Sequence, residues 1–223
     1  MKIIYEDNHI IVVEKPINVP TQEDESKDLD MLTIIKKYLK EKYNKPRDVY
    51  LGLIHRLDRP VGGVMVFAKT SKAASRLSEE VRKKEFKKEY TAVVCGKLPK
   101  EGKLEDKLVK DSKTNISKVS TEGKLATLSY ETLDYKDGYS LVRINLETGR
   151  SHQIRVQFSS RNYPLYGDQK YNKEVKKQEQ IALFANKLCF SHPVTKEWME
   201  FNLDIPKVYP WNIFDLGGIK WRK

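Results

Sequence analysis

Residues 125–146, LATLSYETLDYKDGYSLVRINL, contain the pattern that decides the fold class. On each side of the turn residues 136–138 the sequence alternates between apolar and polar side chains, which is typical of strands with one buried face. The Asp-Gly pair in that turn favours a tight connection between two antiparallel strands. Residues 153–158 alternate in the same way and are predicted to form a further strand. We therefore expect a mixed, largely antiparallel central sheet.

The rest of the chain predicts helices and strands that complete an α+β fold. Residues 2–5 and 9–14 are rich in β-branched side chains and flank a turn-like segment, which predicts an opening hairpin. Apolar residues at helical spacing predict helices over 31–39, with Asp30 as the N-cap, and over 71–85. Further strands are expected at 49–54, 64–68 and 90–94, and an exposed insertion without regular structure at 97–124.

Length and charge limit the classes of protein to consider. The 223 residues suit one large domain or two small ones, and no linker or internal repeat suggests a split, so a single domain over residues 1–223 is expected. Lys and Arg number 42 against 31 Asp and Glu, a net charge of +11. Such a surplus favours a polyanionic partner, although a lysine-rich surface kept for solubility explains it equally well.

Cysteine usage and hydropathy argue against several other classes. Cys95 and Cys189 are far apart and form no CxxC pair, so neither a disulfide framework nor a thiolate metal site is predicted. The chain shows no signal peptide and no apolar run of about 18 residues. We expect a cytoplasmic protein that does not bind membranes.

The densest polar cluster is HRLDRP at residues 55–60, between two apolar stretches. His55, Arg56 and Arg59 surround the single carboxylate of Asp58. By itself such a segment is more typical of a surface loop with ion pairs than of an active site.

A second polar cluster at residues 147–158 changes that balance. If residues 153–158 form a strand, Arg150 shares the parity of Ile154 and its charge enters the apolar side. A cation in that position needs a carboxylate partner, for which Asp58 is the candidate. Arg155 and Gln157 would then lie on the opposite, solvated face.

Three segments together resemble the signature motifs of the RluA-type pseudouridine synthases: HRLDRPVGGVMVFAKT (55–70), KEYTA (88–92) and TGRSHQIRVQF (148–158). YEDNHIIVVEKP (5–16), YPLYGDQKY (163–171) and FSHPVTKEW (190–198) are similar to further blocks of that family, and all occur in the expected order. The resemblance implies the pseudouridine synthase catalytic fold, without an evident S4-like domain at the N-terminus.

The family resemblance implies a cofactor-free and metal-free isomerisation of uridine in RNA, with ribosomal or transfer RNA stem-loops as substrates and no obligate protein partner. Asp58 would be the catalytic aspartate, Tyr90 the active-site tyrosine and Arg150 the partner of the aspartate. Arg56 would insert where the target base leaves the stack. The sequence departs from the family pattern at Val61 and Gly62, where Thr-Ser is common, at Gln157, where His is frequent, and at Phe184.

Further basic residues are candidates for contacts with the RNA. They are His55, Arg59, His152, Arg155, Lys83, Lys84 and Lys87. Lys83, Lys84 and Lys87 are each individually more typical of a solvated surface charge. Three questions stay open at this stage: whether Asp58 acts as nucleophile or base, whether the chain is instead a non-catalytic RNA-binding protein or RNA chaperone, and whether it hydrolyses another glycoside. The hydrolase is disfavoured because it normally needs a second positioned carboxyl group.

Overall fold

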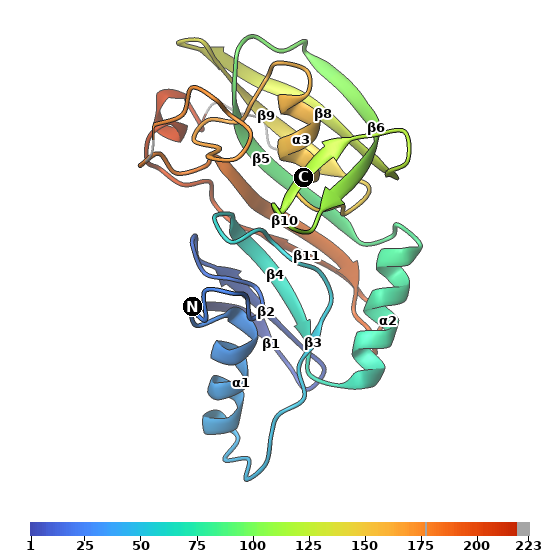
Figure 1. Ribbon diagram of the computed structural model, residues 1–223. Helices are drawn as coiled ribbons and strands as arrows, with labels where there is room; N and C mark the ends of the chain where they lie inside the picture. Colours follow the sequence, from blue (N-terminus) through green and yellow to red (C-terminus); the bar gives the residue numbers. More distant parts are fainter. Residues whose placement is uncertain (177, 218–223) are drawn as a thin grey trace. The chain divides into compact units, whose positions relative to one another are not determined.

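The computed structural model describes residues 1–176 and 178–217. It divides into two compact units, described in turn: Met1–Lys88 with Ala185–Leu203, and Glu89–Phe184 with the described residues from Asp204 onward. The order of elements and the dominance of antiparallel strands confirm the predicted α+β class (Figure 1). The expectation of a single domain stays a prediction.

The first unit is built on antiparallel strands that begin with the predicted hairpin. Strand β1 (Lys2–Glu6) pairs with β2 (Ile10–Lys15), and β2 pairs with β4 (Gly62–Ala68). Strand β10 (Leu183–Ser191) follows β4 in the sheet order and carries β11 (Trp198–Asn202) as an antiparallel neighbour. The strand expected over residues 49–54 shrinks to the two residues of β3 (Gly52–Leu53), which pair with β4.

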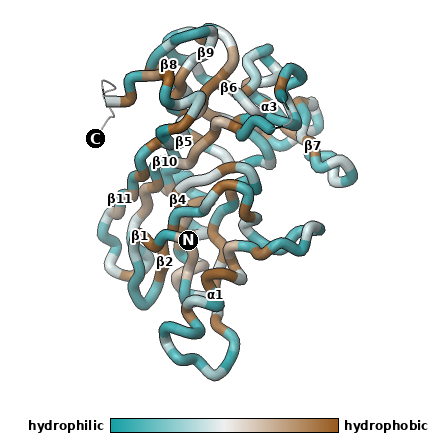
Figure 2. Tube along the Cα trace, turned by 90° about the vertical axis from the view of Figure 1, so that its left-hand side faces the viewer, coloured by the Kyte–Doolittle hydropathy of each residue, from teal (hydrophilic) through white to brown (hydrophobic). Residues whose placement is uncertain are grey.

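Both faces of the central strands of this unit are buried. One alternation, formed by Ile10 and Val12 of β2 with Val64 and Val66 of β4, packs in one cluster with Leu77 of helix α2 (Ser71–Arg82). The opposite alternation is equally buried. Helix α1 (Met31–Lys42) contributes one apolar face, with Met31, Ile35 and Leu39 buried. The tube coloured by hydropathy shows the apolar residues concentrated along these strands (Figure 2).

Capping residues set where both helices begin. The predicted cap of α1 is confirmed, because the Asp30 side chain accepts the N–H of Thr33. Thr70 caps α2 in the same way by accepting the N–H of Ala73. Each side chain satisfies a backbone donor that the first helical turn leaves without a partner.

The second unit contains an antiparallel sheet in the order β5-β9-β8-β6-β7. The elements are β5 (Lys87–Cys95), β6 (Glu101–Asp111), β7 (Ile116–Val119), β8 (Lys124–Lys136) and β9 (Tyr139–Leu146). The predicted turn between β8 and β9 is confirmed: Asp137 and Gly138 both have positive φ, as a two-residue hairpin loop of type I′ requires.

The prediction of an irregular insertion over residues 97–124 is wrong. Strands β6 and β7 occupy most of it. Along β6 every second residue from 102 to 108 is buried or half-buried, as a strand requires. Gly102 and Asp106 occupy two of these positions, so apolar side chains recur only at Leu104 and Leu108, and the sequence does not show the two-residue alternation in hydropathy that normally marks a strand.

The strand predicted over residues 153–158 is also wrong, because these residues form helix α3 (Gln153–Ser159). Six consecutive side chains of this short helix are buried. When every side chain of a six-residue segment is buried, its hydropathy cannot distinguish the 3.6-residue period of a helix from the two-residue period of a strand. A short 3₁₀ turn, η1 (Trp211–Ile213), follows later in the chain. Within the described residues, no helix has the length and apolar character needed to cross a bilayer.

Candidate active site

Asp58 lies in the loop between β3 and β4, and its neighbours hold the backbone on both sides. Leu57 is buried, and the Thr21 hydroxyl both donates to its carbonyl (2.8 Å) and accepts its N–H (3.3 Å). On the other side, the N–H of Val61 donates to the Asp58 carbonyl at 2.9 Å. The half-buried Asp58 side chain therefore projects from a backbone with little freedom.

A fully buried lysine, Lys15, supports the same loop. Its ammonium group donates to the carbonyls of Pro16 (3.0 Å), Arg59 (3.0 Å) and Val61 (2.8 Å). Burial lowers the pKa of Lys15 to about 8, the negative charge of Asp58 opposes that shift, and Arg59 adds to it. Lys15 thus joins the end of β2 to the residues that flank Asp58.

The two arginines beside Asp58 have different surroundings. The Arg59 guanidinium is bound by groups of the same chain. It donates to the Ser26 hydroxyl at 2.7 Å and pairs with the Asp28 carboxylate, and the Asp24 carboxylate lies 3.8 Å away. Arg56 is exposed, and its side chain has no hydrogen bond or ion pair with any described residue. Of these two, only Arg56 has a guanidinium available for a partner outside the chain.

His55 is held inside the unit as a neutral imidazole. Its Nε2 accepts the N–H of Val66 at 3.3 Å, and its ring centroid lies 5.5 Å from that of Phe86. Burial lowers the pKa of His55 to about 3, and the positive charge of Lys88 adds to this shift. A contact between His55 and RNA stays a prediction, and at neutral pH it would involve the uncharged ring.

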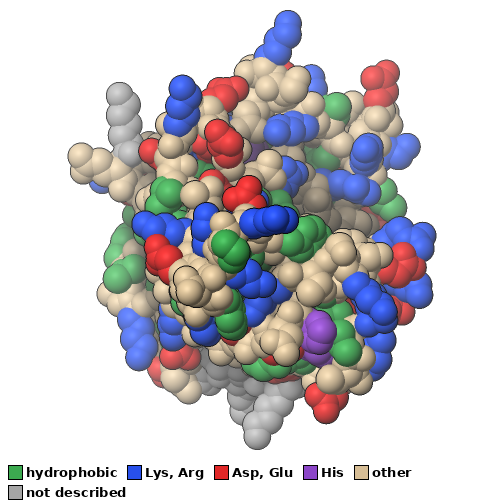
Figure 3. Space-filling model, turned by 90° about the horizontal axis from the view of Figure 1, so that it is seen from below, with side chains coloured by type: hydrophobic (Ala, Val, Ile, Leu, Met, Phe, Trp, Pro, Cys, Tyr) green, Lys and Arg blue, Asp and Glu red, His purple; other side chains and the backbone are tan. Residues whose placement is uncertain are grey.

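Three lysines predicted to contact RNA lie where α2 leads into β5. Lys83, Lys84 and Lys87 are exposed. Lys83 lies 3.6 Å from the Glu79 carboxylate, and Lys87 donates to the Lys84 carbonyl at 3.3 Å. Lys and Arg side chains are widespread on the face shown in Figure 3 and outnumber the acidic side chains there. Such a surface suits the backbone of a nucleic acid.

Tyr90 and Arg150 belong to the second unit. Tyr90 lies in β5 opposite Ile144 and is 6% exposed, so it is a buried aromatic residue. Arg150 is exposed, and its Nε donates to the Leu125 carbonyl at 2.8 Å. The parity argument that placed Arg150 on an apolar face fails, because the residues after it form a helix. The pairing of Arg150 with Asp58 stays a prediction.

The backbone of Arg150 is held by a relay of glutamine side chains. The N–H of Arg150 donates to Gln153 Oε1 (3.0 Å), and Gln153 Nε2 donates to Gln157 Oε1 (3.1 Å). Gln157 Nε2 in turn donates to Asp106 (2.8 Å) and to the Ala126 carbonyl (3.2 Å). This relay connects the loop before α3 to β6 and β8 through groups that are mostly buried.

Arg155 and His152 have partners inside the second unit. Arg155 is buried, and its guanidinium pairs with both carboxylate oxygens of Asp168 at 2.8 and 2.7 Å. His152 is 9% exposed, and its Nδ1 lies 2.7 Å from the Tyr171 hydroxyl. The expectation that Arg155 faces solvent is wrong, and its guanidinium is committed to a buried ion pair.

A comparison with protein families identifies the chain. The model of the RNA pseudouridylate synthase family matches residues 9–160, which include the Asp58 loop, Tyr90 and the Arg150 segment.

The chain belongs to the RNA pseudouridylate synthase family.

Relatives of this pseudouridylate synthase agree with the assignment. Ribosomal large subunit pseudouridine synthase D of Yersinia pestis is 33% identical over 93% of this chain and 68% of its own length. An RNA pseudouridine synthase of Bacillus subtilis is 35% identical over 88% of this chain and 66% of its own. Human RNA pseudouridylate synthase domain containing 4 has the same fold, with a TM-score of 0.77, 22% identity, and coverage of 92% of this chain and 89% of that one.

Three departures from the usual pattern of these synthases have structural explanations. Val61 supplies both a backbone donor and a backbone acceptor to the Asp58 loop, and Gly62 begins β4, so backbone groups hold this turn. Gln157 is fully buried in the relay under the Arg150 loop. Phe184 is a buried residue of β10.

The residues that hold the pseudouridylate synthase loops were missed by sequence reasoning. Lys15 ends an apolar strand, and a charge in that position needs a partner inside the protein. This pattern could have identified Lys15 from the sequence. Gln153 and Gln157 lie four residues apart, a spacing that favours contact on a helix. Thr21 gave no signal, because nothing in its polar neighbourhood separates it from a surface residue.

Metal ligands are a separate question for this site. Over residues 1–176 and 178–217, no group of three or more His, Cys, Asp or Glu side chains has a geometry that could hold a metal ion.

Proposed function

We propose that this chain converts specific uridines of a structured RNA to pseudouridine, with Asp58 as the catalytic group and ribosomal RNA as the first substrate to test. The choice of RNA follows from the relatives named for the large ribosomal subunit. Transfer RNA stem-loops are the second substrate class. The proposed setting is the cytoplasm, without an obligate protein partner.

The reaction is a rearrangement that needs no external oxidant or reductant. The glycosidic bond from the sugar C1′ to the uracil N1 breaks, the base turns, and C1′ bonds to C5. The proton of C5 leaves to solvent and N1 takes up a proton. A carboxylate in the position of Asp58 serves as a nucleophile toward sugar or base, or as a base that removes a sugar proton.

The main support for the proposal is that buried side chains hold the Asp58 loop in place. Thr21 and Lys15 form five hydrogen bonds with backbone groups of Pro16, Leu57, Arg59 and Val61. A catalytic group must be held close to its productive geometry, and two buried side chains do this for the residues on either side of Asp58.

The other site residues receive roles that follow from their surroundings. A target base inside folded RNA must leave its stack to reach the carboxylate. We assign to Arg56 the filling of the vacated space, because its guanidinium is exposed and free of partners among the described residues. Arg150 is proposed to pair with Asp58, and Tyr90 to pack against the base.

The test measures release of tritium from ribosomal RNA that contains 5-tritiated uridine. Wild-type protein should release tritium, and Asp58→Asn should lose the activity while keeping the melting temperature and the affinity for RNA. Asp48→Asn, which changes an exposed aspartate of the same unit, is the matched control and should retain full activity. Binding of RNA without tritium release by the wild type would instead favour a non-catalytic RNA-binding protein.

A further inference from the structure

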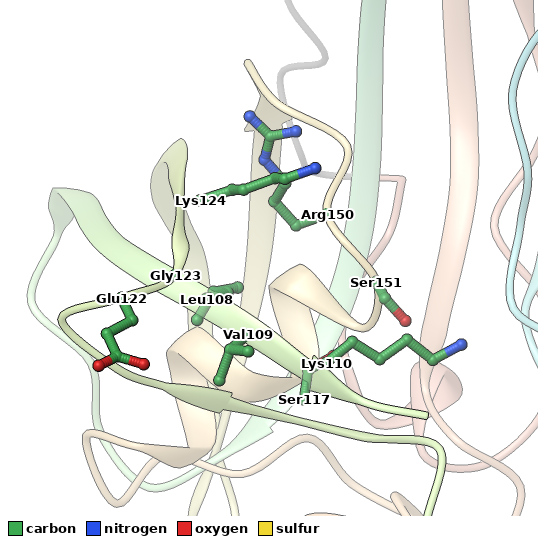
Figure 4. Close-up of a pocket in the computed structure, with 9 residues that line it drawn as sticks. All are labelled: Leu108, Val109, Lys110, Ser117, Glu122, Gly123, Lys124, Arg150 and Ser151. Carbon is green, nitrogen blue, oxygen red and sulfur yellow. The ribbon is translucent and has the colours of Figure 1, made fainter. Parts of the chain in front are cut away.

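A hollow of about 340 Å³ lies in the second unit, beside Arg150 (Figure 4). Residues from β6, from β7, from the turn into β8 and from the loop before α3 line it: Leu108, Val109, Lys110, Ser117, Glu122, Gly123, Lys124, Arg150 and Ser151. Its volume falls in the range of roughly 300–1,000 Å³ that is usual for small-ligand sites. Leu108 and Val109 supply the apolar part of the lining, and all the others except Gly123 carry a charge or a hydroxyl.

The charge around the hollow is not balanced by the protein. Three cations, Lys110, Lys124 and Arg150, line it with one acid, Glu122. Among the described residues, the two lysines have no side-chain hydrogen bond or ion pair, and the Arg150 guanidinium has only the Leu125 carbonyl. Figure 4 shows the Lys124 and Arg150 side chains leaving the rim on the same side. Three cations with a single acid leave a net positive charge, and an anion would be attracted to it.

A buried hydroxyl points to a polar ligand. Ser117 is 3% exposed, and its Oγ has no partner at full hydrogen-bonding geometry in the described part of the chain, although the Tyr171 hydroxyl lies close enough to interact with it. Buried hydroxyl groups without partners are rare in folded proteins and call for an explanation. On the rim, Ser151 adds a second, half-buried hydroxyl.

The wall of the hollow is held in place before any ligand arrives. The N–H of Ser117 donates to the Tyr171 hydroxyl at 2.7 Å, and that hydroxyl lies 2.7 Å from Nδ1 of His152, the residue after Ser151. Across the hollow, a Cβ added to Gly123 would lie 2.5 Å from the Leu108 backbone, so the two chain segments approach closely. A site with fixed walls loses less entropy on binding.

We propose that this hollow holds one nucleotide of the substrate RNA other than the target uridine, with its phosphate bound by Lys110 and Lys124. The Ser117 and Ser151 hydroxyls bond its polar edge, and Leu108 and Val109 contact its apolar face. The inference rests on the proposed function, because it takes the ligand to be the same RNA. It adds to that function a contact with the RNA in the unit that does not carry Asp58.

The first test compares two double variants with the same change in charge. Lys110→Ala with Lys124→Ala should weaken RNA binding about tenfold, the loss of roughly one charge-assisted contact, and should lower the slope of log affinity against log salt by about 1. Lys107→Ala with Lys118→Ala removes two exposed lysines of the same hairpin that do not line the hollow, and should change both quantities much less. Equal effects of the two double variants overturn the proposal.

A second variant tests the hydroxyl. Ser117→Ala removes an oxygen that has no partner at full hydrogen-bonding geometry in the described residues, so the melting temperature should stay the same or rise, while RNA affinity falls severalfold. Unchanged affinity in a folded Ser117→Ala protein counts against the proposal. A drop in melting temperature with unchanged affinity also does so, because it would show that the hydroxyl serves the fold.

A scan of the RNA identifies the phosphate. Neutral methylphosphonate linkages are placed one at a time around the target uridine, and binding is measured by fluorescence anisotropy. One position should weaken the wild type and the Lys107/Lys118 control, yet add nothing to the loss in the Lys110/Lys124 variant. The proposal fails if the losses add at every position. Binding does not depend on turnover, so a failure of the synthase assignment would appear separately, as absent tritium release by the wild type.

Discussion

Glu6 at the end of β1 provides the sharpest test of how the first unit is held together. Its carboxylate is only 6% exposed. It accepts hydrogen bonds from four donors on α1, on the turn after α1 and on the residue after β4: Tyr38 (2.9 Å), Lys42 (2.8 Å), Tyr43 (2.7 Å) and Lys69 (2.7 Å). We predict that Glu6→Gln destabilises the protein strongly, because it removes the charge on which all four donors converge.

The magnitude follows from the pKa of Glu6. Burial alone would raise this pKa, but the four donors outweigh burial and lower it from 4.5 to about 2. At roughly 1.4 kcal/mol per pKa unit, the ionised carboxylate stabilises the folded state by about 3 kcal/mol relative to the protonated one. Since the pKa is lowered on folding, this stabilisation is fully present above pH 4.5 and is lost as the pH falls toward 2.

Urea unfolding of wild type and Glu6→Gln over a range of pH measures this contribution. The difference in unfolding free energy should be about 3 kcal/mol at pH 7 and should shrink as the pH approaches 2. Glu14→Gln is the matched control, a half-buried glutamate of β2 without a side-chain partner among the described residues, and should cost much less. A difference for Glu6→Gln that is below 1 kcal/mol, or that does not change with pH, would refute the reasoning.

Three further predictions concern RNA and the second unit. Arg56→Ala should slow single-turnover reaction on structured RNA at least tenfold, but much less on RNA whose target uridine is already unstacked; equal losses on both would assign Arg56 to the chemistry or the fold. Replacing Lys83, Lys84 and Lys87 together by Ala should flatten the salt dependence of RNA affinity, and an unchanged slope would place the RNA elsewhere. Gln157→Leu should lower stability by about 1–3 kcal/mol in urea, because it leaves buried polar partners unsatisfied; a neutral result would show that the glutamine relay does not matter.

Local signals in the sequence were sufficient for much of the fold. The opening hairpin, the Asp30 cap and the turn at residues 136–138 depend on neighbouring residues only, and all three are confirmed. The family could be recognised because its motifs are short, continuous and ordered, and the match over residues 9–160 confirms it.

Predictions that depended on distant partners failed. The strand at 153–158 is a helix of seven residues, which is too short to be stable without tertiary contacts. Those contacts come from Asp168, thirteen residues beyond Arg155, and from Asp106 in β6. The lowered pKa of His55 likewise depends on burial and on the charge of Lys88, which is distant in the sequence.

The sequence by itself determined the opening hairpin, the turn between β8 and β9, the beginnings of α1 and α2, and the family, because turn residues, caps and motifs act over a few neighbouring positions. Only the tertiary structure decided which polar residues are committed to partners inside the protein and which are available to RNA. Lys15, Arg59 and Arg155 bind groups within the chain, whereas the side chain of Arg56 makes no bond to the described residues. The distinction depends on burial and on partners that folding brings close together. The residue type alone does not show whether a given arginine or lysine is buried or has such a partner.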